Sequence, residues 1–226
     1  MKYDRIKRAE FIERKNRFTA TILIDGKEEL CHIKTTGRCR ELFINGADIF
    51  VQENISPVRK TKYDLISVYK QDLLVNTDSQ VSNTVALEII NQGRLFNNII
   101  KVKPEYKKLN SRFDFLVELE NNMAFIEVKG VTLEDDGVAL FPDAPTERGL
   151  KHVKELISLI EAGFKACIVF IVQMDGIEVF RPNARQDRAF AEALKKAKEK
   201  GVIIRAFNCN VTFDGIYPAE EIEVQI

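Results

Sequence analysis

Residues 111–133 read SRFDFLVELENNMAFIEVKGVTL and predict a β-hairpin. From 112 to 119, aromatic and aliphatic side chains take every second position, which is the period of a strand. Asn121 and Asn122 then supply a turn, because asparagine tolerates the left-handed backbone of tight hairpins. In the second strand, one face carries Ala124, Ile126 and Val128, and the other carries Phe125, Glu127 and Lys129.

The register of this hairpin decides which side chains meet. A two-residue turn pairs Glu120 with Met123 and places Asp114 opposite Lys129. Paired residues share a face, so Asp114, Glu127 and Lys129 are expected to converge. Two carboxylates beside an ammonium fit a Mg²⁺ site, and the cation with Lys129 could activate a water against a phosphodiester. A cross-strand ion pair on a solvated face explains the same residues, and the spacing alone favours that simpler explanation.

Composition indicates a globular protein and excludes some classes of site. The chain has 226 residues, and its 34 Lys+Arg balance its 34 Asp+Glu, so any basic surface must be local. No apolar run is long enough to span a bilayer, and the charged N-terminus lacks the apolar core of a signal peptide. The four cysteines are scattered, which predicts free thiols and a cytoplasmic location with no membrane partner. Two histidines exclude a histidine-rich metal site.

Residues 1–82 read as short strands separated by turns. The expected strands are 18–24, 30–34, 48–53, 62–70 and 72–76, which predicts a small closed β-barrel with an OB-like fold. Cations cluster in or beside the predicted loops, where OB barrels contact single-stranded nucleic acid. The candidate nucleic-acid-binding residues are Arg14, Arg17, Arg38, Arg59 and Lys60. Solubility accounts for these cations equally well.

Residues 83–226 predict a second domain, a mixed α/β sheet with helices on both faces. A helix is expected from Asn83, as N-cap, to Gln92, and a loop containing Pro104 leads into the hairpin. Further elements are a strand at 138–141, a helix at 147–162 capped by Thr146, a strand at 165–173, a helix at 185–200 and a strand at 202–207.

Two polar residues of the predicted helices have open roles. Glu88 lies among apolar residues of the first helix, and either extends from the helix edge or aims a further acid at the hairpin face. His152 lies beside the apolar stripe of the helix at 147–162, where we expect a structural histidine.

Helix, hairpin with Asp…Glu-x-Lys, helix and strand is the core order of the PD-(D/E)xK nuclease superfamily. The chain also resembles a narrower family, the sugar fermentation stimulation protein family, SfsA. The resemblance rests on phrases spread along the whole chain: NRF (16–18), TTGRCREL (35–42), RKTKYDL (59–65), RFDF (112–115), EVKGVTL (127–133) and FPDAPTERGLKHVKEL (141–156). Where the family has Pro-Asn before the first helix, this chain has Ser82-Asn83.

The resemblance implies an OB-like domain, a restriction-endonuclease-like domain and DNA binding without sequence preference, single strands included. It further implies a Mg²⁺ (or Mn²⁺) site held by Asp114, Glu127 and the carbonyl of Val128. Lys129 would position water and Glu88 would be the helix acid. These residues would hydrolyse phosphodiesters.

Two other interpretations remain open. The protein could be a non-enzymatic DNA-binding regulator of sugar (maltose) metabolism with a vestigial metal site, because nuclease-like folds also bind without cutting. A barrel that binds a small molecule or a protein is a third reading, which the neutral charge keeps open. The sequence gives no oligomeric state.

Overall fold

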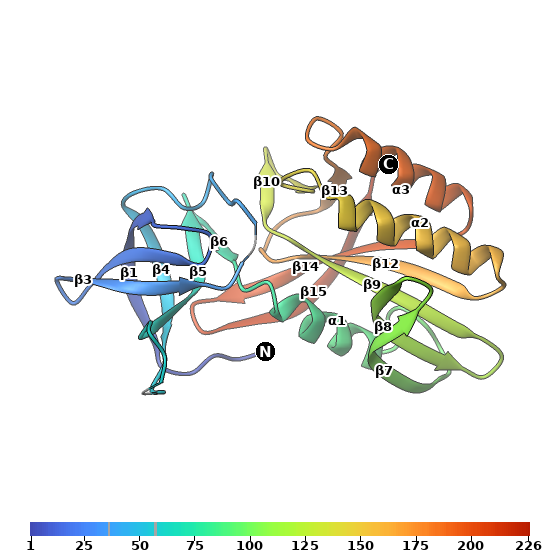
Figure 1. Cartoon of the computed structure of the whole chain (residues 1–226), viewed down its shortest axis with the longest axis horizontal. Helices are drawn as coiled ribbons and strands as arrows, with labels where there is room; N and C mark the ends of the chain where they lie inside the picture. Colours follow the sequence, from blue (N-terminus) through green and yellow to red (C-terminus); the bar gives the residue numbers. More distant parts are fainter. Residues whose placement is uncertain (36, 57) are drawn as a thin grey trace.

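The N-terminal part of the molecule in Figure 1 is a barrel built from β1 to β5. The computed structural model describes residues 1–35, 37–56 and 58–226. Strand β1 (Ile6–Arg14) pairs with β2 (Thr19–Ile24) and β4 (Ala47–Glu53), and β2 pairs with β3 (Lys27–Ile33). Strand β5 (Tyr63–Lys70) pairs with β4 and, in parallel, with β3, which closes the ring. The predicted OB-like barrel is confirmed.

The sequence did not predict the first strand of the barrel, β1. In β1 only Ala9 and Phe11 are fully buried, and charged residues surround them, so the apolar alternation is too short to identify a strand. Strand β6 (Leu73–Asn76) pairs with β5 outside the ring and leads towards the second domain.

The rest of the chain, from α1 onward, forms a mixed sheet with helices on both faces, as predicted. Its order is β10-β11-β13-β15-β14-β12-β9-β8-β7. The central strands β9, β12 and β14 are parallel, which requires crossover connections through helices. The bounds are β7 (Ile99–Lys108), β8 (Ser111–Leu119), β9 (Met123–Val131), β10 (Leu133–Asp135), β11 (Val138–Phe141), β12 (Lys165–Val172), β13 (Val179–Pro182), β14 (Ile203–Thr212) and β15 (Gly215–Val224).

Helices cover the two faces of this sheet (Figure 1). Helix α1 (Val81–Asn91) packs on β9, β12 and β15, while α2 (Glu147–Glu161) and α3 (Arg188–Glu199) pack together on the other face. Thr146 accepts a hydrogen bond from the Gly149 N–H, so the predicted cap of α2 is confirmed. The cysteines are free and buried. No helix in the described ranges is long and apolar enough to cross a membrane.

Two local predictions were wrong. Residues 99–108 form β7 instead of a loop, and Pro104 fits there because β7 is an edge strand, where no ladder N–H is needed. Helix α1 begins at Val81 with Gln80 as its N-cap, so Asn83 lies inside the first turn. The expected domain boundary, between residues 82 and 83, therefore falls within α1.

A buried polar network joins the two domains. The Gln173 side chain donates from Nε2 to the Asn76 and Asp78 carbonyls, at 2.9 and 3.1 Å, and to Asn76 Oδ1 at 3.2 Å. Its Oε1 accepts from Ser82 Oγ at 2.9 Å. Gly130 lies against this network, and a Cβ there would come within 2.4 Å of Gln173 Oε1. Gly130 is therefore the residue that lets β9 pass the domain junction.

Candidate metal centre and adjoining cleft

The β8–β9 hairpin forms with its turn one residue earlier than predicted. Leu119 N–H bonds to the Asn122 carbonyl, so the turn lies over Glu120 and Asn121, and Glu118 pairs with Met123. The predicted pairing of Glu120 with Met123 is wrong by two residues. Because a shift of two residues preserves the faces of a strand, continuing the observed register still places Asp114 on the face that carries Glu127 and Lys129.

The hairpin ladder opens at Asp114. The recorded register ends at Phe115–Ile126, and continuing it would place the Val128 N–H opposite Phe113. Instead Asp114 Oδ2 accepts the Val128 N–H at 2.8 Å. In an antiparallel ladder the N–H and C=O of one residue point to the same neighbouring strand, so the Val128 carbonyl also faces the Asp114 side.

Helix α1 orients the second oxygen of Asp114. Asn83 Nδ2 donates to Asp114 Oδ1 at 2.9 Å, across 31 residues of sequence. Burial raises the pKa of Asp114 above its ordinary value, and the negative charge of Glu127 raises it further. The Asp114 carboxylate is thus held by two neutral donors and destabilised by a nearby like charge.

Glu127 is 3% exposed, and its two carboxylate oxygens have different surroundings. Its Oε1 contacts both Lys129 Nζ and His152 Nδ1. Its Oε2 is buried and has no hydrogen-bond partner among the residues that the structure describes. Burial acts to raise the pKa of Glu127, but the hydrogen bond with His152 and the charge of Lys129 outweigh it and lower the pKa. Glu127 is therefore a buried carboxylate with one oxygen, Oε2, that lacks a hydrogen-bond partner among the described residues.

These residues fit a divalent cation. A cation would give Glu127 Oε2 a partner and relieve the repulsion between the two carboxylates. Asp114 and Glu127, with the Val128 carbonyl, would supply oxygen ligands, and Mg²⁺ characteristically keeps several waters as well. Among the described residues, no group of three His, Cys, Asp or Glu side chains is placed to hold a metal. Any cation here would bind through few protein ligands.

Two residues lie differently from expectation. Glu88, expected as the helix acid, contacts the N-terminal amine of Met1 at 3.5 Å, and Asn83 is the α1 residue that touches Asp114. Five residues separate Asn83 from Glu88, which is about 140° around a helix, so the two face different ways. His152 is 4% exposed, as a structural histidine would be, yet it contacts Glu127 directly.

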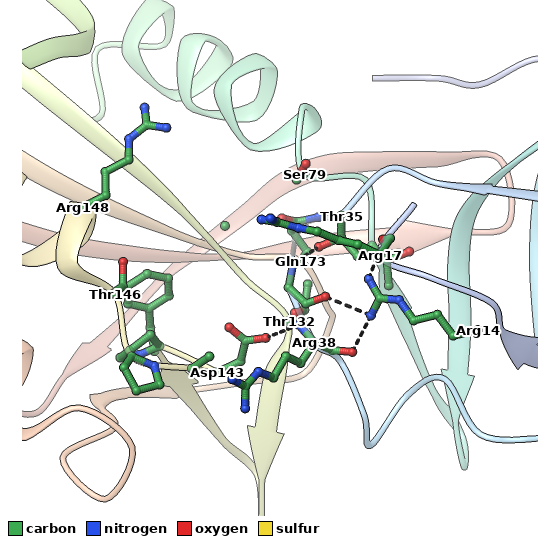
Figure 2. Close-up of a pocket in the computed structure, with 17 residues that line it drawn as sticks. Arg14, Arg17, Thr35, Arg38, Ser79, Thr132, Asp143, Thr146, Arg148 and Gln173 are labelled. Atoms are coloured by element: carbon green, nitrogen blue, oxygen red, sulfur yellow. Dashed lines mark hydrogen bonds between the residues drawn. The ribbon is translucent and has the colours of Figure 1, made fainter. Parts of the chain in front are cut away.

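A cleft of about 810 Å³ opens beside this site, between the barrel and α2. Figure 2 shows Arg17 and Arg38 on the barrel side and Arg148, from the start of α2, on the opposite side. Gly130 and Thr132, which follow Lys129 on the chain, line the cleft between them. Asp143 is the one acid among the described lining residues, and its Oδ2 accepts the Arg38 N–H at 2.8 Å. The cleft is therefore predominantly basic.

The predicted nucleic-acid contacts have different surroundings. Arg14 donates to the carbonyls of Arg17, Gly37 and Arg38, at 2.7–3.1 Å, so it braces two barrel loops. Burial lowers the pKa of Arg14. Arg59 binds both oxygens of Asp64, whose charge offsets its own. Arg17, Arg38 and Lys60 are exposed, and the first two line the cleft.

Arg148 is a cleft residue that the sequence interpretation missed. It lies in the first turn of α2, where the helix dipole disfavours a cation. A residue whose type conflicts with its local structure often marks a functional position. A cation in the first turn of a helix was therefore the available sequence signal. Asn83 gave no comparable signal, because its contact with Asp114 depends on tertiary structure.

Two family models and full-length relatives match this chain along its length. The model of the SfsA N-terminal OB domain matches residues 12–77, and that of the sugar fermentation stimulation protein RE domain matches 80–215. A sugar fermentation stimulation protein homolog of Clostridium beijerinckii is 50% identical over 224 residues, covering 99% of each chain. One from Ruminiclostridium cellulolyticum is 49% identical over 226 residues, covering 100% of each.

A solved structure, SfsA of Pyrococcus furiosus in complex with Ca²⁺, has a TM-score of 0.89 at 31% identity and covers 100% of this chain and 98% of its own. Together these matches show that the chain belongs to the sugar fermentation stimulation protein (SfsA) family.

Proposed function

We propose that this SfsA-family chain binds DNA without sequence preference in the cleft beside α2 and hydrolyses phosphodiester bonds with a divalent cation, Mg²⁺ or Mn²⁺. The observation that carries the proposal is the buried, unpartnered Glu127 Oε2, as far as the described residues go. A buried carboxylate oxygen without a partner is unfavourable, and a cation is the ligand that best compensates it. The Pyrococcus relative, solved in complex with Ca²⁺, supports a cation-binding role.

The chain's own residues have distinct tasks in this proposal. Asp114, Glu127 and the Val128 carbonyl would hold the cation, which when bound polarises a phosphoryl oxygen. Asn83 keeps one Asp114 oxygen in place from α1. Lys129 contacts Glu127 and its side chain is 14% exposed, so its ammonium can also donate to a water or a phosphate oxygen.

The arginines of the cleft supply affinity in the proposal. Arg17 and Arg38 face the cleft from the barrel and can pair with phosphates, which carry no sequence information. Binding of this kind releases counterions and is therefore steeply salt-dependent. Lys129 and the cleft-lining Gly130 are adjacent on β9, so a strand in the cleft passes close to the carboxylates.

A cleavage assay tests the proposal. Single-stranded, duplex and branched DNA and RNA would be incubated at low salt with Mg²⁺ or Mn²⁺, using wild type and Lys129→Ala. We expect wild type to cleave at least one substrate and the variant to lose cleavage. The matched control is Lys154→Ala, an exposed lysine on α2 that should retain full activity.

A second candidate function follows from the small number of ligands. Because no third acidic side chain joins Asp114 and Glu127 in the described ranges, the site could hold a structural cation in a DNA-binding regulator. That function predicts DNA binding without cleavage of any substrate, and unchanged affinity in Asp114→Asn. Cleavage that is lost in Lys129→Ala would exclude it.

A further inference from the structure

A second pocket is lined by His152, the residue that contacts Glu127 of the candidate metal centre. This pocket, the α2 pocket, has a volume of about 510 Å³ and lies between the start of β8 and the first turns of α2. Its lining residues are Asn110, Ser111, Arg112, Glu147, Arg148, Lys151 and His152. Of these residues, only Arg148 also belongs to the cleft proposed above to bind DNA.

The charge of the α2 pocket suits an anion. Arg148 and Lys151 are three residues apart and so share one side of α2, and Arg112 faces them from β8. Glu147 is the only acid among its described lining residues. Arg148 has no ion pair or hydrogen bond within the described ranges. Arg112 reaches Glu105 only at 3.5 Å and Lys151 reaches Glu155 only at 3.9 Å, so both cations remain available.

Ser111 adds an observation that is independent of charge. The residue is 7% exposed and lines the pocket, and its hydroxyl has no hydrogen-bond partner among the described residues. A buried hydroxyl without a partner is unfavourable, and an anion's oxygen would accept its hydrogen. Lys151 Nζ is held close by, because it donates to the Asn110 carbonyl at 2.7 Å.

The α2 pocket is connected to both parts of the proposed site. His152 forms one of its walls and contacts Glu127 Oε1, so a single side chain separates the pocket from a candidate cation ligand. Arg148 lines both the pocket and the cleft, which makes the two basic regions continuous around the start of α2. A nucleic-acid strand could therefore contact this chain on both sides of the reacting phosphate.

We propose that the α2 pocket binds a backbone phosphate of the DNA strand, next to the metal centre and continuous with the cleft through Arg148. This inference rests on the function proposed above and adds to it that the substrate strand extends in both directions past the reacting phosphate. The protein then acts on internal bonds and has no need of a strand end.

Binding of a labelled oligothymidylate, measured by fluorescence anisotropy in EDTA over a series of salt concentrations, tests the pocket without requiring cleavage. We expect Lys151→Gln and Ser111→Ala to weaken binding severalfold. Lys151→Gln should also reduce the slope of log affinity against log salt by about 0.7, the value for one phosphate contact to a single strand. Lys154→Gln, the same charge change one turn further along the exposed part of α2, should change neither quantity.

The outcomes separate this inference from the proposed function. If Arg17→Gln weakens binding while Lys151→Gln and Ser111→Ala behave like Lys154→Gln, DNA binding stands and the pocket assignment is overturned. If wild type binds no DNA at low salt, the proposed function fails and the inference fails with it. Weaker binding in both pocket variants, together with cleavage of circular single-stranded DNA by wild type, would support internal action.

Discussion

Two buried polar clusters of this protein differ in charge and in whether every polar atom has a partner. At the domain junction, the amide of Gln173 has a partner for each polar atom, in Asn76, Asp78 and Ser82. At the candidate metal centre, Glu127 is equally buried, but its Oε2 has no partner within the described ranges. The groups that bond Gln173 are uncharged and leave none of its polar atoms without a partner, whereas the metal centre is charged and incomplete.

This difference separates a structural role from a ligand-binding one. A fully bonded buried network rigidifies the structure and has no capacity left for a ligand. A buried network with an unpartnered polar group lowers the stability of the fold until a ligand supplies the missing partner. A ligand that binds there therefore stabilises the folded state. The comparison makes predictions of opposite sign for the two clusters: loss of the junction should destabilise the protein, and completion of the metal centre should stabilise it.

The largest effect is expected at the junction. Gln173→Ala removes the partners of several buried groups at once, so we expect the free energy of unfolding to fall by about 3 kcal/mol. Equilibrium unfolding in urea measures this change. Gln186→Ala, at an exposed glutamine, is the matched control and should lie within about 0.5 kcal/mol of wild type. Equal stability of the two variants would show that the network does not hold the domains.

Addition of a cation should act in the opposite direction. At a Mg²⁺ or Mn²⁺ concentration about a hundredfold above Kd, binding to the folded state alone stabilises it by about 2.7 kcal/mol. Differential scanning calorimetry with and without the cation should show a higher Tm for wild type. Asp114→Asn should lose this shift, because the cation loses one of its two carboxylates, while Asp143→Asn in the cleft should keep it. A cation-induced shift that survives in Asp114→Asn would place the cation elsewhere.

The sequence predicted the elements better than the contacts between them. The barrel, the hairpin and the cap of α2 follow from period-2 alternation, asparagine turns and Thr146, which are local signals. The contact between Asn83 and Asp114 joins residues 31 apart in the sequence and depends on how α1 packs. Likewise, Glu88 looked like a site residue until the fold placed it beside the N-terminal amine of Met1. Propensity cannot supply such information.

For the same reason, the sequence could not tell which basic residues of the barrel line the cleft and which pair with an acid. Arg17 and Arg38 line the cleft, but their position in predicted loops could not distinguish them from Arg59, whose charge is offset by Asp64. The sequence does not reveal this ion pair, because alternation along β5 predicts which way the Asp64 side chain points but not which residue it meets. Because its charge is already paired with that of Asp64, Arg59 has a structural role, like the fully bonded groups at the domain junction.

Asp64 is a buried carboxylate whose two oxygens both have partners. Its Oδ1 contacts His32 Nδ1 at 3.0 Å, and its Oδ2 accepts from Arg59 at 2.8 Å. Burial acts to raise the pKa of Asp64, but the hydrogen bonds and charge of Arg59, aided by His32, lower it below the ordinary value of 3.8. A lowered carboxyl pKa means that the folded state binds the proton more weakly than the unfolded state does.

The smallest predicted effect follows from that sign. The stabilisation by Asp64 is fully present above the unfolded pKa of about 3.9, and it is lost as the pH falls through the lower, folded pKa. We expect wild type to lose about 1 kcal/mol more than Asp64→Asn between neutral pH and pH 2, in unfolding experiments at matched ionic strength. Parallel curves for the two proteins would contradict the ion pair. A stability advantage of wild type at neutral pH that disappears in acid would show that a completed charged cluster in this protein stabilises the fold without any ligand, in contrast to the metal centre.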